Sequence, residues 1–248
     1  MVPRGRLLVV SPHLDDAAFS CAALLERAEA VDVLTVCAGR PDPPRTGAWD
    51  RWTGFPDSDA SIAARRREEI RAFEGTPHRV VMLDLLEGQY VKAPRPRADA
   101  DELERALGKW ADDGSGTVAI PAAAGRRHRF PSDRVEKLIT AASGPRRHPD
   151  HLFVRDVALD ALAGRPDIDL LVYAELLYQW GRKPDRELAR IARSRGLTAR
   201  QLELPVDRSA KAARIAAYES QVSHLFPERG RLDDERTLPP TERYWWLR

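Results

Sequence analysis

Short apolar runs alternate with helical patterns along most of the chain, and this alternation restricts the fold more than any other feature. Residues 6–11 (RLLVVS) and 116–121 (GTVAIP) have the length and apolar character of buried strands, and a helical pattern precedes the next strand in each case. Strands that alternate with helices favour a mainly parallel sheet with helices on both faces. The sequence therefore predicts an α/β fold that is Rossmann-like and doubly wound.

The predicted elements run from the first residues to the last. The predicted strands are residues 6–11, 31–38, 78–85, 116–121, 168–176, 201–206 and 243–248. The predicted helices are residues 16–30, 61–75, 99–113, 148–164 and 207–226. Residues 122–147 break the alternation, and a short helix is expected within them at 130–143. No repeat and no change of composition divides the chain, so residues 1–248 are expected to form a single domain.

Composition and charge restrict the partners of the protein. The chain has 40 basic and 38 acidic residues and a net charge of +2, which argues against a nucleic-acid partner. No long apolar span or signal peptide is visible, so a cytoplasmic protein without a membrane partner is expected. The two cysteines, Cys21 and Cys37, form no CxxC pair and are expected to be small buried side chains. The sequence is compatible with a homo-oligomer.

One histidine and two aspartates directly follow the first predicted strand, in the stretch VVSPHLDDAAF. Polar groups at the mouth of a buried strand are costly unless they are paired. Zinc binds imidazole and carboxylate ligands, and a catalytic zinc keeps one position open for water. His13 and Asp16 could supply two ligands, with Asp15 close to the metal. The alternative is that one of the aspartates only caps the following helix.

A second cluster, His148, Asp150 and His151, precedes the predicted helix after the fourth strand. If strands one and four are neighbours, as a doubly wound order allows, both clusters meet where ligands bind in such sheets. The alternative is a simple His-Pro-Asp-His turn in which Asp150 caps the helix. Two such motifs at strand-to-helix turns favour the metal site over two unrelated turns.

The long segment between the second strand and the next helix, residues 39–60, is rich in proline and glycine. Loops of this length in compact domains are often functional. Trp49 and Trp52 within it could line a substrate pocket or form a lid. The alternative is that the loop folds these aromatic rings onto its own protein.

The stretches SPHLDDAAFSCAALL and HPDH resemble the two signature motifs of the PIG-L/LmbE-like family of zinc-dependent N-deacetylases. The similarity extends to AARRREEIRAFEG, LLVYAELLY, AAYESQVSHLF and ERYWWL, and so spans most of the chain. Two positions depart from the common pattern, because many members have proline at Leu14 and glutamate at Ala17. Neither is a ligand position, so the departures leave the predicted metal site intact.

The resemblance implies a role for each residue of the two motifs. It implies that one zinc ion per chain is bound by His13, Asp16 and His151. It implies that Asp15 is the general base, that His148 stabilises the oxyanion and assists the leaving amine, and that Asp150 holds His148. It further places a substrate-binding arginine at Arg65 or Arg66.

These residues suit amide hydrolysis, because zinc lowers the pKa of bound water from 15.7 to about 7 and a carboxylate can move the remaining proton. The expected enzyme is a hydrolase that removes an acetyl or small acyl group from an amine of a sugar-containing or specialised metabolite. Residues 122–147 and the tryptophan loop suggest a pocket for something other than a plain amino sugar. The alternatives are a metal-dependent hydratase, which clustered arginines at 65–67 or 126–129 would favour, and a non-catalytic metal- or sugar-binding protein.

Overall fold

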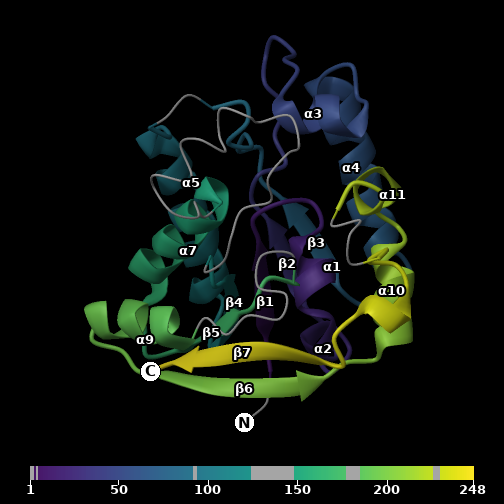
Figure 1. The fold of residues 1–248 in the computed structure, drawn as a ribbon. Helices are drawn as coiled ribbons and strands as arrows, with labels where there is room; N and C mark the ends of the chain where they lie inside the picture. The colour runs from purple at the N-terminus through teal and green to yellow at the C-terminus, as the bar shows by residue number, and fades with distance from the viewer. Residues whose placement is uncertain (1–2, 4, 92–93, 124–147, 177–184, 226–229) are drawn as a thin grey trace.

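A seven-stranded sheet in the order β3-β2-β1-β4-β5-β7-β6 organises the protein (Figure 1). The computed structural model describes residues 3, 5–91, 94–123, 148–176, 185–225 and 230–248. Strands β1 to β5 are parallel to their neighbours, whereas β7 runs antiparallel to both β5 and β6. The predicted doubly wound, mainly parallel α/β sheet is therefore confirmed.

The bounds of the elements follow the predicted alternation. The strands are β1 (Leu7–Ser11), β2 (Asp32–Thr35), β3 (Arg79–Met82), β4 (Gly116–Pro121), β5 (Ile168–Tyr173), β6 (Ala199–Pro205) and β7 (Thr241–Leu247). The helices are α1 (Asp16–Ser20), α2 (Ala22–Leu25), α3 (Ala48–Thr53), α4 (Ser58–Phe73), α5 (Arg97–Asp112), α7 (Pro149–Leu162), α9 (Asp185–Ser194), α10 (Arg208–Ile215), α11 (Glu219–Val222) and the 3-10 helix η2 (Glu235–Thr237). No helix in the described ranges is long and apolar enough to span a membrane.

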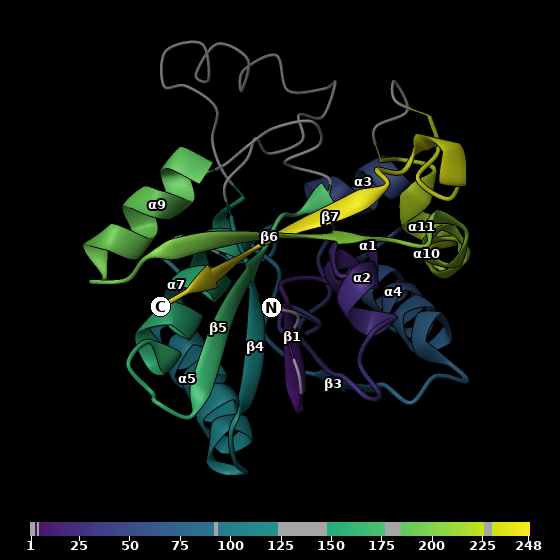
Figure 2. The same cartoon turned by 90° about the horizontal axis from the view of Figure 1, so that it is seen from below.

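Each face of the sheet has its own layer of helices and its own core. Helices α5, α7 and α9 cover one face, and α1, α2, α4, α10 and α11 cover the other, as Figure 2 also shows. Side chains alternate along a strand. Val9 therefore points into the core below α1, α2, α4 and α10, and Val10 points into the core below α5, α7 and α9. Burial on both faces explains why β1 is apolar at nearly every position.

The chain reverses its direction of winding between β1 and β4. Strand β1 pairs in parallel with β2 on one side and with β4 on the other, so the condition under which the two clusters meet is fulfilled. The loop after β1 and the start of α7 therefore lie at the same edge of the sheet. Ligands bind at such switch points in doubly wound folds.

The predicted helix 16–30 is wrong in extent, because α1 ends at Ser20 and α2 covers only Ala22–Leu25. The break at Cys21 is stabilised from far away in sequence. The Glu242 carboxylate accepts hydrogen bonds from the backbone N–H groups of Ala22 (3.1 Å) and Ala23 (2.8 Å). Lys211 donates to the same carboxylate at 2.6 Å. A helix start is thus capped by a residue of β7, which no local pattern could indicate.

Three other elements differ from the prediction. The predicted helix 207–226 divides into α10 and α11, and α3 lies within the segment predicted as a loop. Helix α9 was not predicted, because only Leu188 and Ala192 of its ten residues are buried and its apolar stripe is correspondingly narrow. The short helix expected at 130–143 lies outside the described residues.

Candidate active site

Three side chains from one turn and two helices form a triangle of metal-binding atoms at the switch point. His13 lies in the turn after β1, Asp16 begins α1 and His151 lies in the first turn of α7. The distances are 3.3 Å from His13 Nδ1 to Asp16 Oδ2, 3.4 Å from His151 Nε2 to Asp16 Oδ2, and 3.1 Å from His151 Nε2 to His13 Nδ1. The structure therefore brings together the three residues that the sequence indicated as ligands.

The dimensions of this triangle fit a tetrahedral metal ion. Zinc-to-nitrogen and zinc-to-oxygen bonds of about 2.0–2.1 Å place two ligands of a tetrahedron about 3.3 Å apart. The three observed distances lie within a few tenths of an ångström of that value. Three protein ligands leave a fourth position for water or substrate, as in catalytic zinc sites.

The charge of the cluster also suits a cation. Although burial acts to raise it, the charge of His151 and the hydrogen bond from His13 lower the pKa of Asp16 to about 2, so this carboxylate is ionised. Burial opposes protonation of His13, but its hydrogen bonds to Asp150 and Asp16 raise the pKa of its imidazole well above the usual range. The acidic surroundings attract positive charge, which a divalent metal can supply in place of a proton.

A carboxylate fixes the ring orientation of each of the two candidate histidine ligands. Nε2 of His13 lies 3.0 Å from Asp150 Oδ2, and Nδ1 of His151 lies 3.1 Å from Glu175 Oε1. An ionised carboxylate accepts the proton of that nitrogen, which leaves the other ring nitrogen of each histidine unprotonated and directed into the triangle. Glu175 is buried and was missed in the sequence, where it is a single glutamate after β5.

Asp150 is held by two further donors. The N–H of Gly88 donates to its Oδ2 at 2.8 Å, and Nη2 of Arg95 donates to its Oδ1 at 2.6 Å. Burial alone would raise the pKa of Asp150, but the hydrogen bond from His13, the nearby histidine charges and the Gly88 N–H together lower it well below its usual range. A Cβ atom on Gly88 would lie 2.8 Å from Asp150 Oδ1, so only glycine permits this approach.

Asp150 faces two histidines. Its Oδ2 lies 3.0 Å from His13 Nε2, at hydrogen-bond distance, and 4.0 Å from Nδ1 of His148, which it was expected to hold, at ion-pair distance. The residue at the cap position of α7 is His148 and not Asp150, and the His148 side chain forms no capping hydrogen bond. Asp150 is therefore placed to orient a metal ligand.

Asp15 lies beside the triangle and does not cap α1. It occupies the cap position, but its side chain makes no capping hydrogen bond, which excludes that alternative. Burial, together with the charge of Asp16, raises the pKa of Asp15 well above its usual range, while Arg65 and His13 act in the opposite direction. A carboxyl group with a raised pKa accepts a proton more readily than an ordinary aspartate does and can later return it.

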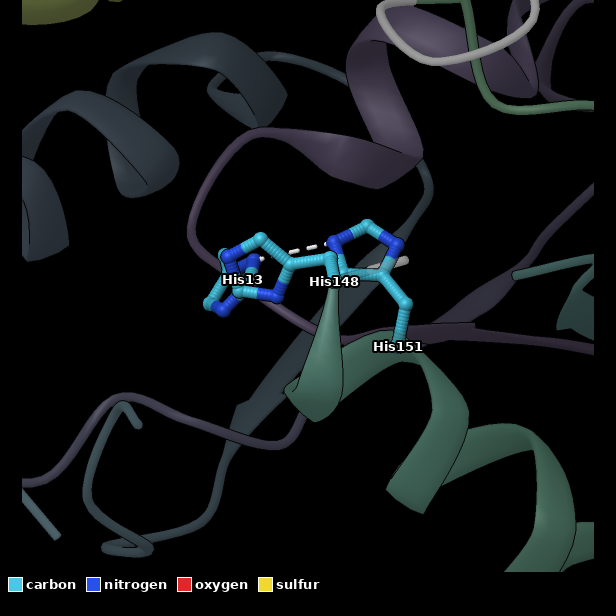
Figure 3. A group of neighbouring side chains, drawn as sticks. All are labelled: His13, His148 and His151. Atoms are coloured by element: carbon cyan, nitrogen blue, oxygen red, sulfur yellow. Dashed lines mark hydrogen bonds between the residues drawn. The ribbon is translucent and has the colours of Figure 1, made fainter. Parts of the chain in front are cut away.

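His148 is the most exposed of the three histidines, with 20% of its side chain accessible. Its ring centroid lies 4.8 Å from that of His13 and 4.9 Å from that of His151. Figure 3 shows the three imidazoles gathered at the start of α7 and the turn after β1. His148 therefore borders the metal triangle on its accessible side, where a substrate would approach.

The two candidate arginines face different partners. Arg65 is buried and forms a short ion pair with Glu87, which also accepts a hydrogen bond from Gln89 at 2.7 Å. The charges of Glu87 and Asp15 raise the pKa of Arg65 despite its burial, so Arg65 is the arginine next to the site. Arg66 instead donates to Asp84 at 3.1 Å near the surface.

The tryptophans of the 39–60 segment pack onto the C-terminal part of the chain. Nε1 of Trp49 donates to Gln221 Oε1 at 2.7 Å, and the ring also borders the core. The Trp52 ring meets the edge of His224, with centroids 6.4 Å apart. The contacts agree with the alternative in which the aromatic rings fold onto their own protein.

Glu69 is fully buried, and the charge of Asp16 in the site acts on it. It accepts hydrogen bonds from the hydroxyls of Thr35 (2.9 Å) and Tyr218 (2.6 Å), which join α4, β2 and the segment before α11. Burial is the main cause that raises the pKa of Glu69, to about 7. The charge state of this group therefore changes close to neutral pH.

The segment 122–147, which was expected to shape the substrate pocket, lies outside the described residues except for Ala122 and Ala123. The N–H of Ala123 donates to Glu175 Oε1 at 2.8 Å. Glu175 thus holds both the ligand His151 and the start of this segment. Arg126, Arg127 and Arg129 also lie outside the described residues.

Fold and donor set together define an α/β protein with a candidate catalytic metal site at its switch point. The chain belongs to the PIG-L family, since the family described as PIG-L: GlcNAc-PI de-N-acetylase matches residues 8–162, more than half of it. The resemblance seen in the sequence is confirmed. A comparison with curated proteins finds no match.

Several solved structures share the fold over nearly the whole chain. A zinc-inhibited form of a teicoplanin deacetylase has a TM-score of 0.70 and 23% identity, with 98% of both chains covered. The deacetylase of the A40926 pseudoaglycone has a TM-score of 0.67 and 23% identity, with 99% of this chain and 98% of the other covered. The 4-carboxy-2-hydroxymuconate hydratase of Pseudomonas putida is more distant, with a TM-score of 0.54, 16% identity and coverage of 89% and 81%.

Proposed function

We propose that this protein is a zinc-dependent N-deacetylase that removes an acetyl or similar small acyl group from an amine of a sugar-containing or specialised metabolite. The observation that carries the proposal is the triangle of His13, Asp16 and His151, with Asp15 and His148 beside it. We assign one zinc ion per chain to the triangle and treat residues 1–248 as one catalytic domain.

When bound, a divalent metal would supply Lewis acidity toward the amide carbonyl and toward water. The three ligands are fixed for that purpose before substrate arrives. Asp150 and Glu175 hold the two imidazoles by hydrogen bonds of 3.0 and 3.1 Å. Ligands held in this way lose little conformational freedom when the metal binds, which favours affinity.

Asp15 is assigned as the general base. It would take a proton from the attacking water and later return it to the leaving amine. Its raised pKa suits both directions of transfer, because a base that is too acidic would not accept the proton. The neighbouring guanidinium of Arg65 stabilises the carboxylate form and keeps it available to accept a proton.

His148 is assigned as the donor to the oxyanion that develops at the amide carbonyl. Its place at the accessible rim, 4.8 Å from the His13 ring, would bring it close to a carbonyl bound at the triangle. In acyl-transfer sites, one such donor contributes about 2.7–4 kcal/mol to transition-state stabilisation. A non-catalytic binding protein would need neither Asp15 nor His148 in these positions.

The ion pairs of two arginines near the triangle favour hydrolysis over hydration. A hydratase that acts on a carboxylated substrate would need an uncompensated positive charge beside the metal. In the described part of the site, Arg65 is ion-paired with Glu87, and Arg95 with Asp150 and Asp99. Their charges are balanced within the protein, which favours a neutral amide substrate over an unsaturated carboxylate.

The test is a substrate screen with purified, zinc-loaded protein. The panel includes N-acetylated and N-acylated glycosides, sugar-containing antibiotics of the kind named for the similar deacetylases, and an unsaturated dicarboxylate. Release of free amine, followed with an amine-reactive fluorophore, supports deacetylation when the Asp15→Asn variant releases none. Hydration of the unsaturated acid without any amine release would refute the proposal in favour of the hydratase.

A further inference from the structure

A second group of metal-binding atoms lies on the other side of His13. A ring nitrogen of His13, a carboxylate oxygen of Asp150 and the Sγ atom of Cys37 all lie within 4.8 Å of one another. All three residues are buried. The nitrogen that faces Asp150 is Nε2, at 3.0 Å from Oδ2, whereas Nδ1 faces the triangle described above. His13 therefore stands between two donor sets.

The backbone fixes Cys37 at this position. Strand β2 ends at Thr35, but its pairing with β1 continues beyond the strand. The N–H of Cys37 donates to the carbonyl of Pro12 at 2.9 Å, one residue before His13. The thiol is thus carried to the carboxyl edge of the sheet next to the imidazole, and this placement does not depend on a flexible loop.

The composition of the group selects the kind of metal. Thiolate is a soft ligand that prefers soft or borderline cations, and imidazole and carboxylate complete such sites in proteins. A tetrahedral cation needs ligand atoms slightly more than 3 Å apart, and Nε2 and Oδ2 are already at 3.0 Å. Only the thiol must approach, by at most about 1.5 Å. The cation would replace the proton of the hydrogen bond between His13 and Asp150.

We propose that Cys37, Asp150 and Nε2 of His13 form a second metal site for a soft divalent cation such as Cd²⁺, and that this site competes with the catalytic triangle for His13. A neutral imidazole offers one lone pair, so His13 serves one site at a time. Cadmium at the second site therefore inhibits the enzyme by withdrawing a ligand, without contact with the substrate.

The proton balance of this exchange is simple. The proton leaves Nε2 of His13 and moves to Nδ1, where Oδ2 of Asp16 lies 3.3 Å away and can accept a hydrogen bond from it. The Cys37 thiol loses its proton to solvent, so one proton is released for each cation bound. Arg95 stays on Oδ1 of Asp150 at 2.6 Å, while the cation takes Oδ2.

The test uses cadmium as the probe and requires no substrate. Protein freed of metal by a chelator is titrated with CdCl₂, and the thiolate-to-cadmium charge-transfer band is followed in the ultraviolet. Wild-type protein should show the band with one thiolate per chain. The variants Cys37→Ala and Cys37→Ser should show none. Cys21→Ala removes the only other thiol, which is equally buried, and should retain the full band.

Competition is tested on the zinc-loaded protein. The cadmium band should appear only as zinc is released, and the released zinc is measured with a chromophoric chelator. Inhibition by cadmium is measured relative to the activity of each protein without cadmium. This inhibition should be at least tenfold weaker in Cys37→Ala than in the wild type. A band that persists in Cys37→Ala, or its absence from the wild type, would overturn the second site. A full band with all zinc retained would overturn the competition. Neither outcome bears on deacetylation, so failure here is distinguishable from failure of the proposed function.

Discussion

Replacement of Glu175 tests whether a buried carboxylate sets the affinity of the metal site. Its Oε1 accepts from His151 Nδ1 at 3.1 Å and from the Ala123 N–H at 2.8 Å. Glu175→Gln keeps an acceptor of the same shape but removes the charge. Charge-assisted hydrogen bonds contribute about 1.5–3 kcal/mol and neutral ones about 0.5–1.5 kcal/mol, so the loss should be about 1–1.5 kcal/mol. The glutamine variant should therefore bind zinc about tenfold more weakly.

Glu175→Ala should have a larger effect, because the buried N–H of His151 loses its acceptor and the ring is free to adopt the other tautomer. Loss of such a partner weakens metal binding by about 10–100-fold, and the alanine variant should lie at the upper end of that range. The expected order of zinc affinity is wild type, then the glutamine variant, then the alanine variant.

Competition with a chromophoric zinc chelator measures these affinities directly and needs no substrate. Asp169→Asn is a matched control, because Asp169 lies on the same strand β5 but its side chain is 57% exposed and distant from the triangle. Circular dichroism should show that all variants remain folded. Wild-type zinc affinity in Glu175→Ala would refute the argument that Glu175 acts through His151.

Three further outcomes are expected. Asp15→Asn should retain zinc, measured by elemental analysis, and lose 10²–10⁴-fold in turnover because it lacks a general base; loss of zinc would make Asp15 a ligand instead. His148→Ala should likewise retain zinc but lose about 10²–10³-fold in kcat, and an unchanged kcat would remove His148 from the chemistry. Because the pKa of Glu69 rises from 4.5 unfolded to about 7 folded, the folded state binds the proton more tightly, and wild-type stability falls by up to about 3 kcal/mol as pH rises through that window. Glu69→Gln should remove this fall in the free energy of unfolding, which is measured by urea unfolding near pH 4 and pH 8. If the free energies of unfolding of the variant and the wild type differ by the same amount at both pH values, the prediction is contradicted.

The parts of the site that could be predicted are those encoded by short spacings. His13 and Asp16 are three residues apart at a strand end, and His151 lies in a motif with its own helix start. Alternating strands and helices then indicated that both motifs meet at one sheet edge if strands one and four are neighbours. The strand order itself came from the structure, although parallel sheets buried on both faces leave few other arrangements.

The supporting residues could not be predicted, because each acts over a long distance in sequence and has no local signature. Arg95 is 55 residues from Asp150, and Glu175 is 24 residues from His151. An isolated charged residue is usually solvated, so composition and periodicity give it no special meaning. The hydrogen bond of Asp150 to His13 was missed for the same reason, since its neighbour His148 was the obvious partner in the sequence.

The break in the predicted helix 16–30 has a similar origin. Local pattern favoured one continuous helix, but the fold supplies an acceptor for a second helix start from a residue about 220 positions away. Tertiary context therefore overrode local propensity at Cys21, where α1 ends and α2 begins.

The position of β7 between β5 and β6 has a consequence for the order of folding. Contacts between residues far apart in sequence form late, because the chain must first close a long loop. During synthesis, β1 to β5 emerge before β7, so β5 presents an unpaired edge to the solvent until residues 241–247 pair with it. The acceptor for the amides of Ala22 and Ala23 arrives with the same strand. The start of α2, which follows the helix that carries Asp16, is therefore completed last, and the exposed β5 edge of the nascent chain is where self-association would begin.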